Sequence, residues 1–311
     1  MKNLENTLLI GSSGFVGKNL KKFLNSNNVN FYEIYGKEDV DIESEGKLDS
    51  FIKKNNTINS IINCAAFVGG VSYGYQFEKD LIYKNSKLAL NIYEAAHRNK
   101  VQLVINPISN CIYPSNIEVY KEKNMFEGLP HESVYFYAQS KRFTIFLSEA
   151  YFKQHGICSN NIVLSNMYGP DDHFEEERSH AVGAIIRKIV EAKRSNIKSV
   201  EIWGSGNQER EWMYIEDGVN AIVKSFNITA GCNTFNIGEN STFSIKFISE
   251  KIKKISKWDG ELIYNTNKPE GVLKKSVDGT YGNSLIKWKP KTDIETVSKI
   301  QLIGIWRISE N

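Results

Sequence analysis

The stretch Thr7-Leu8-Leu9-Ile10-Gly11-Ser12-Ser13-Gly14-Phe15-Val16-Gly17 decides which fold is expected for this chain. Its apolar run predicts a short buried strand, and the spacing of apolar residues from Phe15 to Phe23 predicts a helix. The glycines between them follow the pattern Gly-x-x-Gly-x-x-Gly, which allows a tight turn and lets a diphosphate approach the N-terminus of the helix. A strand, a glycine-rich turn and a helix in this order predict a dinucleotide-binding unit.

Strand-like and helix-like segments alternate over the first half of the chain. Short apolar runs predict strands at residues 7–10, 31–34, 60–63, 101–106 and 162–164. Helical spacing of apolar residues is found at residues 15–23, 47–53, 81–97 and 137–155. This alternation predicts an α/β fold of the Rossmann type, with a doubly wound parallel sheet that is covered by helices on both faces.

The second half of the chain has a different texture. Residues 166–180 form a polar loop region, and residues 181–193 return to helical spacing. A strand at residues 200–203 is followed by Gly204-Ser205-Gly206, and a helix is expected at residues 245–255. These shorter elements predict a smaller C-terminal α/β substrate lobe beside the main sheet.

The domain organisation follows from this change of texture. We expect residues 1–165 to form the dinucleotide-binding domain, with later segments, at about residues 207–232, returning to it. Residues 166–206 and 233–311 are expected to form the substrate-binding lobe.

Charge, length and cysteine usage exclude several classes of protein. The 311 residues carry 39 basic and 36 acidic side chains, so charge gives no argument for binding to nucleic acid or to a membrane. No apolar run reaches membrane-spanning length and no signal peptide precedes the first strand, which leads us to expect a soluble cytoplasmic protein. The four cysteines, Cys64, Cys111, Cys158 and Cys232, form no C-x-x-C pair, so neither a disulfide framework nor a metal site is indicated.

Two short motifs carry the chemistry. In Tyr137-x-x-x-Lys141 a phenol and an ammonium lie one turn apart on a helix, and the ammonium favours the phenolate, so the phenol becomes usable as an acid or base. In Ser109-Asn110-Cys111-Ile112-Tyr113-Pro114, Ser109 can hold a carbonyl oxygen beside that phenol. Cys111 is expected on the same side of an extended strand as Ser109. Together the motifs predict a ketone-reducing site with an additional thiol.

The end of the second strand bears on the choice of cofactor. NAD sites often place an acid there for the ribose 2′-hydroxyl, whereas Ile34-Tyr35-Gly36-Lys37 carries no acid until Glu38. Lys37 could instead meet a 2′-phosphate, which favours NADP(H) over NAD. Basic side chains further along are candidates for a substrate diphosphate: Arg187, Lys188, Arg210, Lys268, Lys274 and Lys275.

At this point the sequence resembles a known family. Beyond the motifs above, the resemblance rests on these segments: Ala65-Ala66-Phe67-Val68-Gly69-Gly70, Asn166-Met167-Tyr168-Gly169-Pro170, Ser179-His180, Trp203-Gly204-Ser205-Gly206, Arg210-Glu211 and Lys268-Pro269-Glu270-Gly271. They make the chain similar to extended short-chain dehydrogenases/reductases and, more narrowly, to the GDP-L-fucose synthase family over nearly its whole length. That family acts as GDP-4-keto-6-deoxymannose 3,5-epimerase/4-reductase.

The resemblance implies roles for individual residues. Tyr137 would give a proton to the reduced C4 oxygen, Lys141 would tune that phenol and bind the nicotinamide ribose, and Ser109 would hydrogen-bond to the keto oxygen. Cys111 and His180 match the family's base and acid for epimerisation at C3 and C5. The partner of the enzyme would be a GDP-linked keto sugar, and a homodimer formed through a helix pair is expected by resemblance.

The resemblance also implies two sets of binding residues. Positions expected to contact NADP(H) are Gly11, Ser12, Ser13, Gly14, Phe15, Val16, Gly17, Lys37, Asp41, Ile42, Ala65, Ala66, Asn85, Pro107, Ile108, Tyr137, Lys141, Leu164, Asn166, Met167 and His180. Positions expected to contact the substrate are Val68, Gly69, Ser109, Asn110, Cys111, Asn166, Arg187, Lys188, Trp203, Arg210 and Glu270.

Departures from the family pattern leave the exact function open. Phe67 stands where the family usually has a lysine, and Lys188 stands for its usual arginine, which loses the bidentate fork. The sugar is therefore either a 6-deoxyhexose or a heptose. Three alternatives remain: a C4 reductase that acts after a separate epimerase on a GDP-4-keto-heptose, an NAD-dependent nucleotide-sugar 4-epimerase or 4,6-dehydratase, and a non-catalytic NADP-binding sensor.

Overall fold

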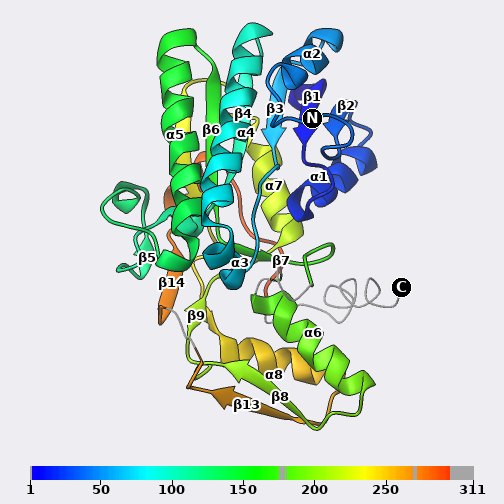
Figure 1. Ribbon diagram of the computed structural model, residues 1–311, viewed down its shortest axis with the longest axis vertical. Coiled ribbons are helices and arrows are strands. Elements are labelled where there is room, and N and C mark those ends of the chain that lie inside the picture. The colour runs from blue at the N-terminus through cyan, green and yellow to red at the C-terminus, as the bar shows by residue number, and fades with distance from the viewer. Residues whose placement is uncertain (1, 175–178, 180, 269–271, 295–311) are drawn as a thin grey trace.

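A six-stranded parallel sheet forms the centre of the larger part of the molecule (Figure 1). The structure is a computed structural model, which describes residues 2–174, 179, 181–268 and 272–294. The strand order is β11-β6-β4-β3-β1-β2, and every pairing is parallel. The strands are β1 (Thr7–Ile10), β2 (Phe31–Ile34), β3 (Ser60–Asn63), β4 (Leu103–Ser109), β6 (Cys158–Leu164) and β11 (Cys232–Ile237). This topology confirms the predicted Rossmann-type sheet.

Helices cover both faces of this sheet because successive strand residues point to opposite sides. Leu8 and Ile10 of β1 belong to one core with α2 (Lys47–Lys54) and α4 (Glu78–Arg98). The intervening Leu9 belongs to a second core with α1 (Phe15–Ser26) and α7 (Ile215–Ser225). Beside α4 lies α5 (Tyr135–His155), and the two helices run together along the first face (Figure 1). The sheet is therefore doubly wound, as predicted.

The smaller lobe is built from two helices and a two-stranded parallel sheet, and it lies below the main sheet in Figure 1. Its helices, α6 and α8, pack on each other. Its strands are β8 and β13, and their pairing is parallel. The bounds are α6 (Ala181–Arg194), β8 (Ser199–Trp203), α8 (Ile245–Ser256) and β13 (Glu261–Asn265). The predicted α/β lobe is thus present.

Two small sheets connect the lobe to the main domain. The first, which we call the junction sheet, has the strand order β12-β9-β14-β5. Its strands are β12 (Phe243–Ser244), β9 (Glu209–Arg210), β14 (Lys274–Val277) and β5 (Val119–Tyr120). The second pairs β7 (Asn166–Tyr168) with β10 (Trp212–Tyr214). Four segments that are far apart in the sequence therefore meet in one sheet between the two parts.

The chain crosses between the two parts at different places from those expected. The expected lobe boundary at residue 233 falls inside β11, which is an edge strand of the main sheet. The later helix α9 (Thr280–Leu285) packs against β11, and the Trp288 indole donates to the Asp217 carbonyl oxygen of α7 at 3.0 Å. Residues 280–288 therefore also pack on the main domain. The β11 sequence Cys-Asn-Thr-Phe-Asn-Ile contains no continuous apolar run, so the sequence pattern did not identify it as a strand.

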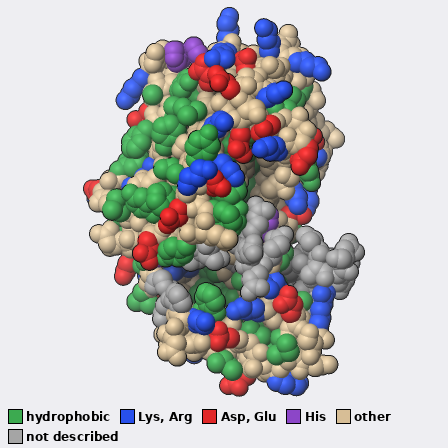
Figure 2. Space-filling model, viewed as in Figure 1, with side chains coloured by type: hydrophobic (Ala, Val, Ile, Leu, Met, Phe, Trp, Pro, Cys, Tyr) green, Lys and Arg blue, Asp and Glu red, His purple; other side chains and the backbone are tan. Residues whose placement is uncertain are grey.

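The remaining short elements connect these parts. They are η1 (Lys2–Leu4), α3 (Val71–Gln76), η2 (Asn110–Ile112), η3 (Glu122–Asn124) and η4 (Glu132–Val134). Among the described residues, no helix is both long enough and apolar enough to cross a membrane. On the face drawn in Figure 2, acidic and basic side chains are intermixed.

Candidate active site

The glycine-rich turn after β1 brings three backbone segments into contact. Gly11 has a φ of +79°, and a Cβ atom there would lie 2.7 Å from the Ala65 nitrogen at the end of β3. A Cβ atom on Gly17 would lie 2.1 Å from the Gly11 oxygen. Only glycine fits both positions, so α1 begins against the ends of β1 and β3. This is the point where the strand order reverses, the usual ligand crevice of open α/β sheets.

Unused hydrogen-bonding groups converge on this turn. Ser12 is fully buried, and its Oγ has no hydrogen-bond partner among the described residues. The first N–H groups of α1 have no intrahelical acceptor, and its N-cap residue, Gly14, supplies no side-chain cap. Buried donors without partners are costly unless a ligand satisfies them. The donors at the N-terminus of α1 fit the diphosphate of a dinucleotide.

The loop after β3 is fixed by a side chain of α4. Asn85 accepts a hydrogen bond from the Phe67 N–H at 2.9 Å and donates to the Phe67 carbonyl oxygen at 2.8 Å. It also donates to the Leu81 carbonyl oxygen at 2.7 Å. Both ends of the Asn85 amide are thus used within the protein. This predicted cofactor residue shapes the loop that contains Ala65 and Ala66.

The end of β2 holds an acid that the sequence analysis passed over. Asp39 folds back, and its Oδ2 accepts a hydrogen bond from the Tyr35 N–H at 2.8 Å. The exposed Lys37 ammonium lies 3.7 Å from Asp41 Oδ2, and Asp41 also accepts a hydrogen bond from Ser44 at 2.8 Å. Ile42 is buried, and its carbonyl oxygen accepts from the side chain of Asn91. Carboxylates and an ammonium are therefore both present after β2, where a ribose would be recognised.

Ser109 ends β4 and caps the turn that follows it. The strand passes through Pro107 and Ile108 to Ser109, whose Oγ accepts a hydrogen bond from the Cys111 N–H at 3.3 Å. Cys111 consequently lies in the 3-10 helix η2, and the expectation that it continues an extended strand is wrong. A serine at this position competes for the backbone N–H and starts a turn.

Tyr137 and Lys141 lie one turn apart on α5, as predicted. The Lys141 ammonium is 5.6 Å from the centroid of the Tyr137 ring. Burial raises the pKa of Tyr137, and Cys111 raises it further. Burial also lowers the pKa of Lys141 to about 8. Desolvation thus outweighs the expected lowering of the Tyr137 pKa by the Lys141 ammonium. The phenol remains protonated at neutral pH, and this is the form that can donate a proton.

Arg142, which sequence reasoning did not single out, ties η2 to α5. It is only 7% exposed, and its Nε donates to the Ile112 carbonyl oxygen at 2.8 Å. Its Nη2 donates to the Met125 carbonyl oxygen at 2.7 Å. The segment that contains Cys111 is thereby held against the helix that contains Tyr137. The only sequence signal was a second cation directly after the Tyr-x-x-x-Lys pattern.

Cations from separate elements surround Cys111. Burial raises the pKa of its thiol, while the Ser109 hydroxyl and the positive charges of Lys275, Lys141 and Arg142 oppose that rise. Lys275 comes from β14 and Lys141 from α5, so the junction sheet and the main domain meet at this thiol. A site that collects positive charge in this way suits an anionic ligand.

Arg210 and Lys275 are register partners in the junction sheet. Arg210 of β9 lies opposite Lys275 of β14. Burial lowers the pKa of each, and for Lys275 the neighbouring Arg210 lowers it further. Two partly desolvated cations side by side repel each other, and a diphosphate would relieve this repulsion. Arg210 was predicted as a substrate-binding residue, and Lys275 was one of the basic candidates.

Glu211 ties the junction sheet to the main domain. It is 1% exposed, its Oε1 accepts from the Glu239 N–H at 2.6 Å, and its Oε2 accepts from the Val277 N–H at 2.9 Å. Its carbonyl oxygen accepts a hydrogen bond from the Asn166 side chain at 3.2 Å. Burial raises the pKa of Glu211 to about 7. No periodicity in the sequence pointed to this buried carboxyl.

Lys188, a predicted substrate residue, and Lys268, one of the basic candidates, lie over the ring of Trp203. This indole is 53% exposed, and the ammonium groups of Lys188 and Lys268 lie 5.7 Å and 5.5 Å from its ring centroid. Lys188 also donates to the Glu201 carbonyl oxygen at 2.9 Å. Arg187, one residue earlier on α6, lies 3.7 Å from Glu191. An exposed aromatic ring flanked by cations suits a nucleotide base and its phosphates.

The places of the other predicted residues in the chain are as follows. Val68 and Gly69 precede α3, Asn110 opens η2, and Leu164 ends β6. Met167 of β7 directs its sulfur toward α7, where a Cβ atom on Gly218 would lie 2.7 Å from it. His180 and Glu270 lie outside the described residues.

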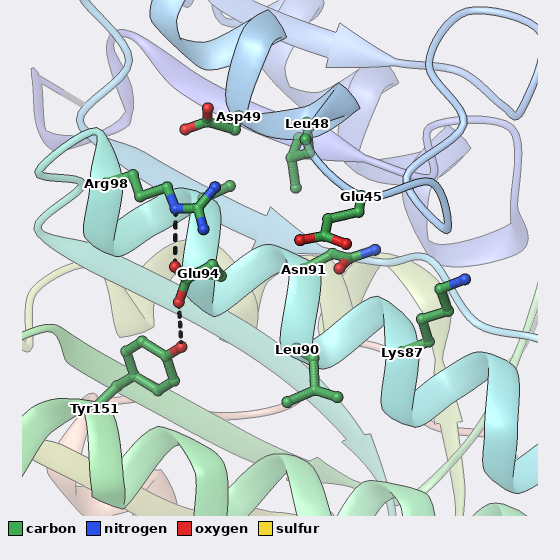
Figure 3. A pocket seen from close by; sticks show the side chains of 11 residues that line it. Glu45, Leu48, Asp49, Lys87, Leu90, Asn91, Glu94, Arg98 and Tyr151 are labelled. Atoms are coloured by element: carbon green, nitrogen blue, oxygen red, sulfur yellow. Dashed lines mark hydrogen bonds and ion pairs between the residues drawn. The ribbon is translucent and has the colours of Figure 1, made fainter.

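A separate pocket lies between α2, α4 and α5 (Figure 3). Glu94 accepts there from Arg98 and from the Tyr151 hydroxyl, both at 2.8 Å. The lining residues of the pocket that Figure 3 labels are Glu45, Leu48, Asp49, Lys87, Leu90, Asn91, Glu94, Arg98 and Tyr151. None of the predicted site residues lines this pocket.

Known proteins are similar to this chain over most of its length. A probable GDP-L-fucose synthase from Oryza sativa subsp. japonica is 28% identical over 287 residues, covering 92% of this chain and 87% of that protein. GDP-L-colitose synthase from Yersinia pseudotuberculosis is 30% identical, covering 93% of this chain and 94% of that protein. The solved structure of a GDP-mannoheptose C4 reductase from Campylobacter jejuni with NADP bound has a TM-score of 0.86 at 22% identity, covering 100% of both chains.

The last comparison shows the fold, and a family model defines the membership. The model of the NAD dependent epimerase/dehydratase family matches residues 7–238, which include the glycine turn, Ser109 and the Tyr137–Lys141 pair. The chain belongs to this family, and it is an oxidoreductase of the extended short-chain dehydrogenase/reductase type.

Proposed function

We propose that this protein reduces the C4 ketone of a GDP-linked 4-keto sugar and uses NADPH to do so. The observation that carries the proposal is the assembly around Cys111. The Ser109 turn and the α5 helix with Tyr137 and Lys141 are held together by Arg142, while Lys275 reaches the same place from the lobe side. The relatives named above, which are synthases and reductases of GDP-sugars, support the choice of substrate.

The chemistry follows from the protonation states. When bound, NADPH supplies a hydride to the C4 carbon. The Ser109 hydroxyl donates a hydrogen bond to the keto oxygen and fixes its position. The protonated Tyr137 phenol gives its proton to that oxygen as it gains negative charge. Lys141, charged below its pKa of about 8, stabilises the tyrosinate that remains.

The cofactor would lie along the glycine turn, with its diphosphate on the N-terminus of α1. Ser12 Oγ and the first N–H groups of the helix would supply the hydrogen bonds, because these groups have no partner of their own. The exposed Lys37 would meet a 2′-phosphate by releasing Asp41, which supports NADP(H) as the cofactor. One relative was solved with NADP bound, which agrees with this choice.

The substrate would extend from Cys111 across the junction sheet to Trp203. Arg210 and Lys275 would hold its diphosphate, and Trp203 with Lys188 would contact the nucleoside end. The sugar would then face the Ser109 turn. Phe67 packs in an aromatic cluster with Tyr73 and Phe77, with ring centroids 5.3 Å and 6.2 Å away. This aromatic cluster stands where the family usually has a lysine, so the sugar is to be tested as both a 6-deoxyhexose and a heptose.

Epimerisation at C3 and C5 is a separable part of the proposal. It would use Cys111 and His180. Burial raises the pKa of the Cys111 thiol, and the charges of Lys275, Lys141 and Arg142 offset only part of that rise. NADPH oxidation with GDP-4-keto-6-deoxymannose, run in deuterated water, tests both steps. Turnover with deuterium at C3 and C5 supports an epimerase/reductase. Turnover without that label supports a reductase alone, with pre-epimerised 4-keto heptoses tested next.

One observation favours a second candidate function, an NAD-dependent nucleotide-sugar 4-epimerase or dehydratase. Asp39 lies at the end of β2, where an acid can hold a ribose 2′-hydroxyl. Purified protein that carries stoichiometric NAD and consumes no NADPH would favour this alternative. Protein that is isolated without NAD and oxidises NADPH in the presence of the keto sugar would support the reductase.

We also propose a homodimer formed through α4 and α5. These neighbouring helices expose Tyr83, Leu90 and Phe146, and Phe146 stacks on Phe126 at 4.8 Å. Figure 2 shows hydrophobic side chains gathered over this side of the molecule. Size-exclusion chromatography with light scattering would give the mass of a dimer for the wild-type protein and the mass of a monomer for Phe146→Glu.

A further inference from the structure

The register of the junction sheet sorts its side chains onto two faces. Val277 of β14 lies opposite Tyr120 of β5, and Lys275 lies opposite Arg210 of β9. Because alternate residues of a strand share a face, Arg210, Lys275, Val277 and Tyr120 all point to the same side. The burial supports this, since Val277 and Tyr120 are each 1% exposed. The inward face of the sheet thus carries two cations and a phenol.

The opposite face of the same sheet is turned toward solvent. Val119, next to Tyr120, is 44% exposed. Lys274, next to Lys275, forms an ion pair with Glu209 at 3.0 Å. The two faces therefore differ in how their charges are paired. Lys274 on the outer face is paired with a carboxylate, whereas Arg210 and Lys275 on the inner face form no ion pair within the described residues.

Tyr120 is one of two stacked tyrosines whose hydroxyl groups are used differently. Its ring lies 4.6 Å from that of Tyr113, and the two planes differ by only 5°. Tyr113 donates a hydrogen bond to Asn236 Oδ1 at 2.7 Å, inside the protein. The Tyr120 hydroxyl, by contrast, forms no hydrogen bond within the described residues, and its oxygen is not completely shielded from solvent. A nearly buried phenol normally has a partner, and this one is still open to a partner from outside the chain.

The surroundings of the Tyr120 hydroxyl indicate where that partner would come from. Burial raises the pKa of Tyr120, Arg210 opposes the rise and Cys111 adds to it. The phenol thus stays a hydrogen-bond donor through the neutral range. The sheet register puts this phenol on the same face as Arg210, the cation proposed to hold the diphosphate, and the thiol of Cys111 also acts on its charge.

We propose that Tyr120 is a substrate-binding residue whose hydroxyl donates a hydrogen bond to an oxygen of the bound nucleoside-diphosphate sugar, between the group held by Arg210 and the carbon facing Cys111. The inference rests on the proposed function for the location of the substrate. The oxygen belongs either to the glycosyl phosphate or to the sugar itself. Both are acceptors, so the same donor serves either one, and the Tyr113 stack would fix its direction.

The test compares Tyr120→Phe with Tyr113→Phe. Each variant removes one hydroxyl and keeps the stacked rings. Tyr120→Phe should raise the KM for the keto sugar, and the Kd for GDP-mannose, by about 3- to 10-fold, the effect of one hydrogen bond, with Tm unchanged. Tyr113→Phe should lower Tm, because it leaves Asn236 Oδ1 buried without its donor, and should leave KM unchanged.

Binding measurements locate the acceptor and keep the two proposals separate. If Tyr120→Phe weakens GDP-mannose but not GDP, the oxygen belongs to the sugar. If both are weakened equally, it belongs to the phosphate. Unchanged KM and Kd, or a fall in Tm with unchanged Kd, would overturn the inference.

Tyr120→Leu provides a second removal of the hydroxyl if the Phe variant precipitates, with NADPH binding as the check on folding. A wild-type enzyme that binds GDP-mannose without reducing any keto sugar would refute the proposed function while this comparison still stands.

Discussion

Two regions contribute to the candidate site in different ways: the edge of the main sheet where its strands end, and the junction sheet. At the main sheet, Ser109, Cys111, Tyr137 and Lys141 come from one turn and one helix, tied together by Arg142. The junction sheet supplies Arg210, Lys275 and Tyr120 from three strands that are far apart in the sequence. The first region holds the groups proposed to move protons, whereas the second holds donors and charges proposed to bind an anion.

On the proposed function, this difference would separate chemistry from recognition. Tyr137 and Lys141, proposed to react, lie on α5, where burial shifts their pKa values. The groups proposed to bind the substrate lie in a small sheet that is tied to the main domain by the buried carboxyl of Glu211. Substitutions in the first region should therefore change kcat, and those in the second should change KM.

The largest effect is expected at Tyr137. Tyr137→Phe removes the proton donor and should lower kcat for NADPH oxidation by about 10²–10⁴-fold, the usual contribution of general acid catalysis. NADPH binding and Tm should be retained, because the phenol is not used to hold the fold. Tyr281→Phe, on an exposed ring of α9, serves as the matched control. Near-normal turnover by Tyr137→Phe would remove this residue from the mechanism.

A smaller effect, on KM, is expected at the junction sheet. Lys275→Met should raise the KM for the nucleotide sugar by about 10- to 100-fold, because one charge-assisted contact to a diphosphate is lost. Lys274→Met, one residue earlier, removes a cation that faces outward and is paired with Glu209, and KM should change little. Equal KM changes in the two variants would show that the inward face of the sheet is not the binding face.

The pH dependence of the reaction tests the burial of Lys141. Its pKa of about 8 in the free enzyme lies below the usual value, so the ammonium is lost as pH rises through 8. The kcat/KM should therefore fall by about tenfold per pH unit above that value. Lys141→Arg keeps its charge in this range and should flatten the alkaline limb at a lower overall rate. An unchanged alkaline limb in that variant would assign the titration to another group.

The smallest effect is expected on stability, at the carboxyl pair beside the junction. Burial raises the pKa of Glu239 to about 8, with Glu211, Asp217 and Asp293 adding to the rise. A raised folded-state pKa means that stability is greatest at acidic pH and is lost as pH rises from about 4.5 to 8. Glu239→Gln should raise Tm by roughly 2–4 °C at pH 8.5 and by less at pH 5.5. An equal change at both pH values would contradict a buried charge at Glu239.

Local patterns in the sequence predicted five strands of the main sheet, β11 excepted, and the elements that carry the Gly11, Ser109 and Tyr137 motifs. The glycine turn, the strand ends and the Tyr137–Lys141 pair each depend on neighbouring residues, and the structure has each of them in the predicted element. The turn at Cys111 was mistaken for strand, because the Ser109 side chain competes for the backbone. A capping bond of this kind competes with the extended conformation, and the residue pattern alone does not show which of the two the chain adopts.

The junction sheet could not be predicted in the same way. Its four strands are two to four residues long, too short for any periodicity to appear. The partners of Arg210, Lys275 and Tyr120 are set by pairing between distant segments. The buried roles of Arg142 and Glu211 also depend on such contacts, since charged residues are otherwise expected at the surface. Long-range pairing was thus the part of the site that sequence reasoning missed.

Transfer of a labelled hydride tests the central claim most directly. The enzyme would be given NADPH carrying deuterium at both C4 positions of the nicotinamide, together with GDP-4-keto-6-deoxymannose or a GDP-4-keto-heptose in ordinary water. The account predicts a product with one deuterium at C4 of the sugar, detected by NMR and mass spectrometry. Product without deuterium at C4, or NADPH left unconsumed with every GDP-4-keto sugar offered, would contradict it.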